Sequence, residues 1–137
     1  MEVNGLTFHH LGLAVRGEQD AINFLSGLGY KIGGKVYDPL QNVNLRLCTC
    51  DNHPTVEVVS QAKGNSPIDS ILRKSGEGVY HTCYETKDAD GVLRRLEDLG
   101  LRVVTVSKPK PAVLFDGKLV SFHQVFGYGL IEFIHLD

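Results

Sequence analysis

The chain has 137 residues with a formal net charge of −2, and 42% of its residues are hydrophobic and 22% charged. This composition is typical of a soluble globular protein, and the nearly balanced charge excludes a surface for nucleic acid or an anionic membrane. No apolar run approaches the roughly 20 residues that a membrane-spanning helix needs, and the first residues lack the pattern of a secretion signal. Three cysteines are too few for a disulfide framework. We therefore expect a cytoplasmic protein without nucleic-acid or membrane partners.

Sequence periodicity predicts the elements of the first half. Residues 6–15 form a strand, and the helix after it carries Ala21 and Leu25 on its apolar stripe and ends at Gly29. Three further strands and a short linking helix are predicted over 31–37, 43–50, 55–60 and 66–74. The order is therefore strand, helix and three strands, followed by a linker.

The second half repeats this order. A strand over 79–86 precedes a helix that has Asp88 as its N-cap and Gly100 after its last turn. The closing strands are predicted over 102–107, 118–125 and 129–136. The proline-containing segment 108–115 is expected to be a solvated loop.

The two halves align with each other at a constant offset of 71 residues. This offset places His10 on His81 and Leu25 on Leu96, and it needs no gap over about twenty positions. Strand, helix phase and helix end therefore match together, which indicates a duplicated module.

Four short strands cannot bury both faces alone, so the two modules should pair their sheets. We predict an α+β fold of two βαβββ modules with pseudo-twofold symmetry, whose mixed sheets form a cupped half-barrel around a metal cleft. The modules span residues 1–62 and 78–137, a linking helix spans 63–77, and together they form one compact domain.

Two glutamates lie in the middle of predicted strands. Glu57 and Glu132 each have hydrophobic neighbours on both sides, where a carboxylate is costly unless its charge is compensated. An exposed face of an edge strand is the alternative for either glutamate alone. The repeat, however, also places a histidine in the first strand of each module, His10 and His81. Each module thus contributes one imidazole and one carboxylate, and pseudo-twofold symmetry would bring all four toward one cleft.

Two imidazoles and two carboxylates suit one divalent metal ion, namely Co, Ni, Mn, Zn or Fe. Four protein ligands on an octahedral ion leave two positions for water or substrate oxygens. The predicted site is therefore of a catalytic rather than a purely structural kind.

Four short motifs carry a family resemblance. The sequence reads His-Leu-Gly-Leu-Ala-Val over 10–15, Val-Glu-Val-Val over 56–59, Val-Tyr-His over 79–81 and Leu-Ile-Glu-Phe-Ile over 130–134. With these motifs nearly the whole chain resembles the vicinal oxygen chelate superfamily, which includes glyoxalase I, methylmalonyl-CoA epimerase, extradiol dioxygenases and antibiotic-resistance proteins. The resemblance implies that the metal ligands are His10, Glu57, His81 and Glu132.

The linker and the segment 76–81 are most similar to those of methylmalonyl-CoA epimerases. This resemblance implies a divalent-metal-dependent isomerase or lyase that acts through an enolate-like intermediate on a carbonyl or acyl-thioester substrate. Glu132 matches the metal-binding carboxylate that also acts as a catalytic base. Where the epimerases carry a second glutamate, this chain has the segment 38–43, in which Asp38 stands slightly too early.

Three other activities remain open at this point. Glyoxalase I shares all four ligand positions, a ring-cleaving dioxygenase needs only three of them, and a metal-free antibiotic-binding protein needs none. Candidate substrate-binding residues are Asp38, Gln41, Cys83 and His123. We expect a small-molecule substrate. The modules can pair within one chain or between two copies, and we expect a homodimer because the chain is so short.

Overall fold

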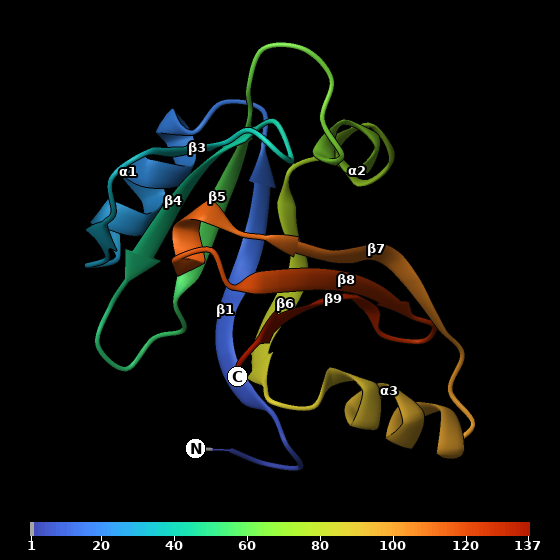
Figure 1. Ribbon diagram of the computed structural model, residues 1–137. Coiled ribbons are helices and arrows are strands. Elements are labelled where there is room, and N and C mark those ends of the chain that lie inside the picture. The colour runs from blue at the N-terminus through green and yellow to red at the C-terminus, as the bar shows by residue number, and fades with distance from the viewer. Residues whose placement is uncertain (1) are drawn as a thin grey trace. The chain divides into compact units, whose positions relative to one another are not determined.

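The computed structural model describes residues 2–137 (Figure 1). These residues fold into two compact units. The first unit is His10–Tyr80, and the second unit combines the residues up to His9 with His81–Asp137. Across the described residues there are nine strands, three α-helices and one short 3₁₀ helix. The α+β class with mixed sheets is confirmed.

The first unit holds five strands of mixed direction, four of them in the order β2-β4-β5-β1 and the fifth, β3, paired to β4. β5 runs parallel to β1, whereas β2, β3 and β5 are antiparallel to β4. Its elements are β1 (Thr7–Val15, which enters this unit at His10), α1 (Gln19–Gly27), β2 (Lys31–Ile32), β3 (Val36–Asp38), β4 (Val43–Thr49), β5 (Val56–Gln61) and α2 (Ile68–Ser75).

The second unit repeats this topology with the strand order β6-β9-β8-β7. β9 runs parallel to β6, and β8 is antiparallel to both β9 and β7. Its elements are β6 (Gly78–Thr86, which enters this unit at His81), α3 (Ala89–Asp98), β7 (Val103–Pro111), the 3₁₀ helix (Val113–Phe115), β8 (Leu119–Val125) and β9 (Gly129–His135).

Two predicted element boundaries were wrong. The single strand predicted over 31–37 is interrupted, because Gly33 approaches the backbone of β4 so closely that a Cβ there would lie 2.2 Å from the carbonyl oxygen of Leu47. In the second unit, β7 continues through the segment predicted as a loop and ends at Pro111. Prolines fit there because β7 is the last strand in its unit's order and the pairing shifts register twice along it.

The helix ends follow the predicted local signals. The Asp88 carboxylate accepts a hydrogen bond of 3.0 Å from the backbone N–H of Gly91 and so caps α3, as predicted. With the carboxylate in this position, a Cβ at position 91 would lie 2.1 Å from its Oδ2 atom, so a side chain there would require Asp88 to shift. After each helix Gly29 and Gly100 have φ values of +99° and +87°, the left-handed conformation in which glycine ends a helix.

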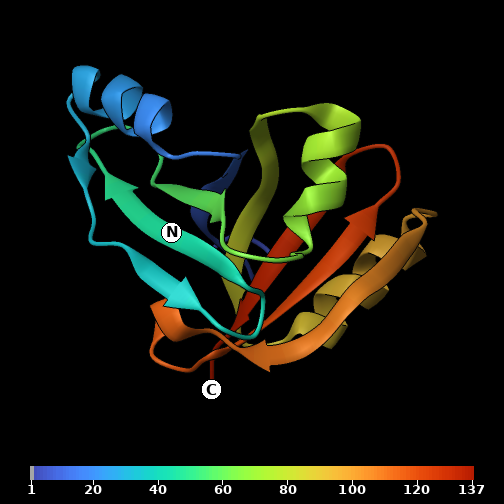
Figure 2. The same cartoon turned by 90° about the horizontal axis from the view of Figure 1, so that it is seen from above.

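Each long helix lies against the sheet of its own unit (Figure 2). Leu25 of α1 belongs to a cluster with Val15 and Val58, and Val92 of α3 belongs to one with Ile131 and Phe133. Side chains alternate along a strand, so the residues between these core positions lie on the opposite face of each sheet. The His–Glu pairs described below lie on that second face.

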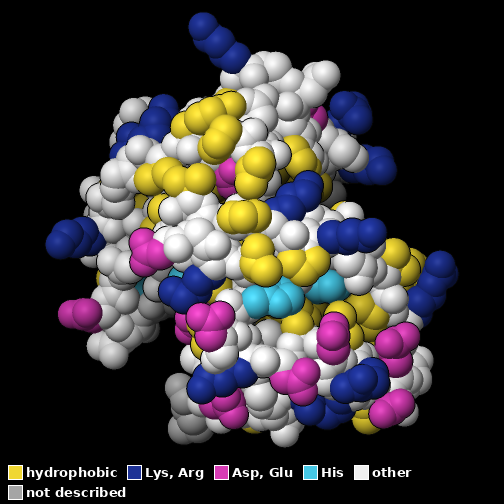
Figure 3. All heavy atoms as spheres, in the orientation of Figure 1, with side chains coloured by type: hydrophobic (Ala, Val, Ile, Leu, Met, Phe, Trp, Pro, Cys, Tyr) yellow, Lys and Arg dark blue, Asp and Glu magenta, His cyan; other side chains and the backbone are white. Residues whose placement is uncertain are grey.

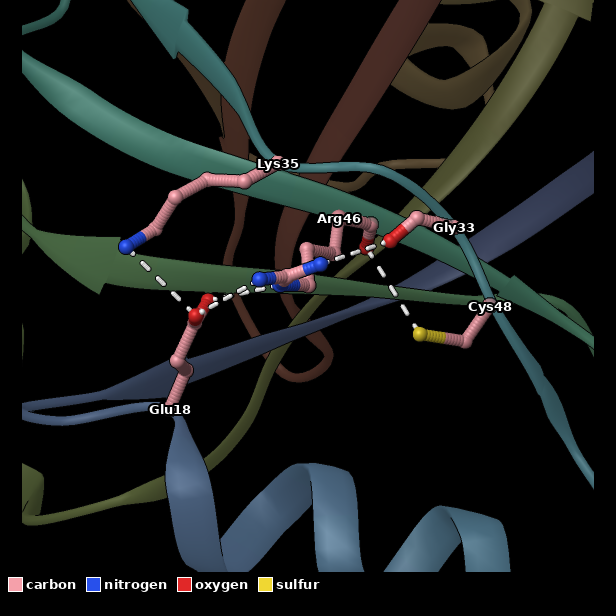
Figure 4. Close-up of polar contacts among 5 residues, drawn as sticks. All are labelled: Glu18, Gly33, Lys35, Arg46 and Cys48. Atoms are coloured by element: carbon pink, nitrogen blue, oxygen red, sulfur yellow. Dashed lines mark hydrogen bonds and ion pairs between the residues drawn. The ribbon is translucent and has the colours of Figure 1, made fainter.

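The helix side of the first sheet also carries an ion cluster (Figure 4). Arg46 of β4 donates from Nε and Nη2 to the two carboxylate oxygens of Glu18, both at 3.0 Å, and from Nη1 to the carbonyl oxygen of Gly33. The Arg46 hydrogen bonds lower the pKa of Glu18. Lys35 approaches the same carboxylate at 3.5 Å from a more exposed position. The cluster therefore ties the start of α1 to β4 and to the backbone at the break between β2 and β3.

The exposed residues of α3 carry charges of both signs, namely Asp90, Arg94, Arg95, Glu97 and Asp98. Figure 3 shows this mixture of positive and negative side chains where α3 lies. Across residues 2–137, the helices are too short or too polar to cross a membrane.

Candidate metal centre

The first unit brings one histidine and one glutamate together. In the parallel pairing of β1 and β5, Gly12 lies opposite Glu57, and His10 is two residues before Gly12 on the same face. The distance from His10 Nε2 to Glu57 Oε1 is 3.5 Å. Both residues are buried, at 0% and 5% exposure respectively.

The second unit makes the same arrangement from β6 and β9. Cys83 lies opposite Glu132, and His81 is two residues before Cys83. The distance from His81 Nε2 to Glu132 Oε1 is 3.1 Å, with exposures of 2% and 3%. The ring of Phe122, which lies opposite Glu132 on β8, packs edge-on against the His81 ring at 5.3 Å between centroids. Phe122 therefore contacts a candidate ligand, although its sequence context did not single it out.

The spacing within each pair fits two ligands of one metal ion. Nitrogen and oxygen ligands that both lie about 2.1 Å from an ion stand about 3.0 Å apart when the angle between them is a right angle. The two observed separations of 3.1 and 3.5 Å are close to this value. A buried carboxylate also needs a positive partner, which a cation supplies as well as a protonated imidazole does. Each pair is therefore suited to supply two ligands to a metal ion.

Two of the candidate substrate-binding residues lie close together in the first unit: Asp38 is the last residue of β3, and Gln41 lies in the turn between β3 and β4. Asp38 is 1% exposed, and its Oδ1 accepts hydrogen bonds from the backbone N–H groups of Leu40 and Gln41. Its Oδ2 accepts a third from Gln41 Nε2 at 3.3 Å. Both side chains thus bind their own turn, and the Asp38 carboxylate has a structural role there.

The other two candidates lie on opposite faces of the second sheet. Cys83 is fully buried and shares its face with Glu132. His123 alternates with Phe122 and therefore lies on the helix side, where it contacts Ser121 and the ring of Phe133. Only Cys83 of these two stands beside a proposed ligand.

Comparisons with known proteins agree with this architecture. A family described as the Glyoxalase/Bleomycin resistance protein/Dioxygenase superfamily matches residues 9–122. No curated protein matches the sequence. Among solved structures, a hypothetical protein from Bacillus halodurans C-125 has a TM-score of 0.77 at 23% identity, with 98% of this chain and 96% of that chain covered.

Two methylmalonyl-CoA epimerases also have similar structures. The enzyme from Mycobacterium tuberculosis has a TM-score of 0.75 at 21% identity, with 100% of this chain and 93% of that chain covered. A variant of the Streptomyces coelicolor enzyme, in complex with 2-nitronate-propionyl-CoA, has a TM-score of 0.68 at 21% identity, with 93% of this chain and 95% of that chain covered. At such identities these structures establish a shared fold. Because the family match extends over most of the chain, the protein belongs to the Glyoxalase/Bleomycin resistance protein/Dioxygenase superfamily, as its sequence motifs predicted.

Proposed function

We propose that this protein is a divalent-metal-dependent isomerase or lyase that moves a proton at the carbon beside a carbonyl or acyl-thioester group. In this proposal the metal ligands are His10, Glu57, His81 and Glu132, so that each unit supplies one imidazole and one carboxylate. The observation that carries the proposal is the matched, buried His–Glu pair in each unit. Membership of a superfamily that contains metal-dependent enzymes supports it.

The donor set favours catalysis over a structural role. Two nitrogens and two carboxylate oxygens leave an octahedral ion with two positions for substrate oxygens, and such an ion would polarise a substrate carbonyl. A proton removed from the neighbouring carbon needs a base within hydrogen-bond reach. Glu132 is the proposed base. Its carboxylate lies 3.1 Å from His81 Nε2, and Phe122 packs against the His81 ring. An enolate-like intermediate results when Glu132 takes the proton.

The substrate we propose is an acyl-thioester. Similar structures include methylmalonyl-CoA epimerases, and one of them binds 2-nitronate-propionyl-CoA. Since Leu40 and Gln41 bind the Asp38 carboxylate with three hydrogen bonds, we do not assign Asp38 as a second base. Proton exchange at one face of the substrate is then the minimal reaction.

Metal content tests the ligand set. We expect the purified protein to bind one divalent ion per chain, and we expect Glu57→Gln and Glu132→Gln each to weaken metal affinity by more than about a hundredfold, because ligand loss should exceed the 10–100-fold effect of outer partners. Glu97→Gln makes the same chemical change on the exposed face of α3 and should retain full metal content. Loss of metal in only one of the two ligand variants would contradict a site shared by both pairs.

Deuterium exchange tests the reaction. Metal-loaded protein should exchange the α-proton of propionyl-CoA with D₂O, as followed by mass spectrometry, and Glu132→Gln should lose this exchange. A hemithioacetal of methylglyoxal serves as the second substrate, and turnover of it alone would replace the epimerase-like assignment with a glyoxalase-type lyase. Metal loading without exchange on either compound would refute the proposed function while leaving the metal site intact.

A further inference from the structure

The helix side of the second sheet contains a buried hydroxyl group that two imidazoles share. Ser121 Oγ lies 2.8 Å from His123 Nε2 and 2.8 Å from His135 Nε2. Ser121 and His123 are on β8 and are 1% and 4% exposed, whereas His135 ends β9 and is partly exposed. A fourth group, Thr105 of β7, lies 3.0 Å from His123 Nδ1 through its hydroxyl oxygen. The four groups form one chain of hydrogen bonds across three strands.

The number of protons in this chain is limited by Ser121. A hydroxyl donates one hydrogen bond and accepts others, and a neutral imidazole has one donor and one acceptor nitrogen. With both histidines neutral, one imidazole therefore donates to Ser121 while Ser121 donates to the other. Thr105 can donate or accept at the far nitrogen of His123, so either direction keeps every hydrogen bond of the chain.

One added proton also fits this arrangement. If His135 is charged, it donates to Ser121, Ser121 donates to His123, and His123 donates from Nδ1 to Thr105. If His123 is charged instead, it donates at both nitrogens, and Ser121 donates to His135. Every hydrogen bond of the chain is kept in both cases.

A second added proton does not fit. Both Nε2–H groups would point at Ser121 Oγ, whose own hydrogen would lose its acceptor within the chain. The two charged nitrogens would also be no further apart than twice 2.8 Å, in a largely buried position. Two like charges at that distance, away from water, repel strongly.

The surroundings provide little to offset a second charge. Burial lowers the pKa of His123 and of His135, and the charge on His135 lowers that of His123 further. The negative charge of Asp90 on α3 raises the pKa of both imidazoles and so opposes these shifts only in part. β6 presents the uncharged Thr86 opposite His135, and β9 places the Phe133 ring beside His123.

We propose that Ser121, His123 and His135 form a pH-sensitive switch that accepts one proton but excludes a second, so that acid weakens the attachment of β9 to β8. The unfolded chain protonates both histidines as the pH falls below about 6.5, whereas the folded network takes up only one proton. The unfolded state then binds more protons, so stability is complete above that pH and is lost as the pH falls. For one excluded proton, the unfolding equilibrium constant rises by up to about tenfold per pH unit.

Histidine protonation in the full-length protein tests this directly. Nuclear magnetic resonance of ¹⁵N-histidine-labelled protein should show the pair taking up a total of one proton between pH 8 and pH 5, while the amide groups of β9 remain protected from exchange. Uptake of two protons with β9 still protected would overturn the proposal. So would a pair that takes up none over this range.

A matched pair of variants tests the link to stability. His135→Gln removes one imidazole but keeps a side-chain amide that can bond Ser121, so the repulsion between two charged imidazoles is removed and only the burial of His123 still opposes protonation. In wild type the unfolding constant rises as the pH falls. In His135→Gln this rise should be smaller than in wild type by up to about tenfold per pH unit. His53→Gln, at an exposed turn of the first unit, should leave the wild-type slope unchanged. Equal slopes in wild type and His135→Gln would overturn the proposal, and should that variant fail to fold, the wild-type titration decides alone.

Discussion

The two units differ in how the polar side chains on the helix side of their sheets find hydrogen-bond partners. Leu47 lies opposite Glu57 as Phe122 lies opposite Glu132, so Arg46 and Ser121 occupy equivalent positions on β4 and β8. Arg46 forms a two-pronged ion pair with Glu18 at the start of α1. Ser121 instead bonds two imidazoles within its own sheet. The first unit ties its helix to its sheet by charge, and the second ties strand to strand.

The opposite faces of the same strands do not differ in this way. There each unit places a histidine on its first strand and a glutamate on its last, and their closest atoms are 3.1 or 3.5 Å apart. If each pair binds a metal ion, as we propose, it must present one nitrogen and one oxygen and few other residues would serve, whereas polar residues under a helix only need hydrogen-bond partners. The choice of residues on the face with the His–Glu pairs is therefore narrower than on the helix face, where any residues that satisfy one another's hydrogen bonds can serve.

The largest difference we expect concerns the helix anchors. Leu25 on α1 is 5% exposed, while Leu96, at the equivalent position of α3, is only partly buried because Val92 takes the deepest place. Leu25→Ala should lower the free energy of unfolding by about 2–5 kcal/mol, and Leu96→Ala by less than half of that. Urea denaturation measures both, and Phe24→Ala, at an exposed position, should change stability by no more than about 0.5 kcal/mol. Equal losses for the two leucines would show that the helices are anchored alike.

The ion cluster of the first unit should give a smaller effect with a characteristic pH dependence. Arg46→Ala removes two charge-assisted hydrogen bonds to a partly buried carboxylate and should cost about 1.5–3 kcal/mol at pH 7. Lys35→Ala, which removes a longer and more exposed contact, should cost less than about 1 kcal/mol.

The acid dependence of that loss separates the two units. The pKa of Glu18 is lowered from 4.5 by the Arg46 hydrogen bonds, so the contribution of this ion pair is present above pH 4.5 and is lost as the pH falls through the folded-state pKa. The difference in stability between wild type and Arg46→Ala should therefore shrink below pH 4.5. The histidine pair of the second unit acts in a higher window, below about pH 6.5. A difference that stays constant down to pH 3 would mean that the ion pair contributes nothing to folding.

The smallest effect concerns the helix caps. Asp88 caps α3 with a 3.0 Å hydrogen bond, whereas no side chain caps α1 at Glu18. Asp88→Ala should cost about 1 kcal/mol in thermal or urea unfolding, and Asp88→Asn, which can make the same bond, should remain close to wild type. If both variants lose the same stability, the negative charge near the helix start matters rather than the hydrogen bond.

Local signals in the sequence determined most of the elements. Alternation located β1 and β6, the spacing of apolar residues located both long helices, and Asp88 and the glycines after the helices marked their ends. These signals succeed because each depends on residues within a few positions of one another. The offset of 71 residues then indicated that the second half repeats the first, which the matching strand orders of the two units bear out.

Contacts between distant residues required the tertiary structure. The break near Gly33 arises from the close approach of β4, and the ion pair joins Arg46 to Glu18 across 28 positions. His123 looked from its position like a substrate contact, yet strand register turns it toward Ser121 and away from Glu132. Sequence periodicity fixes which face a side chain occupies, but which groups meet on that face depends on how strands far apart in the chain are paired.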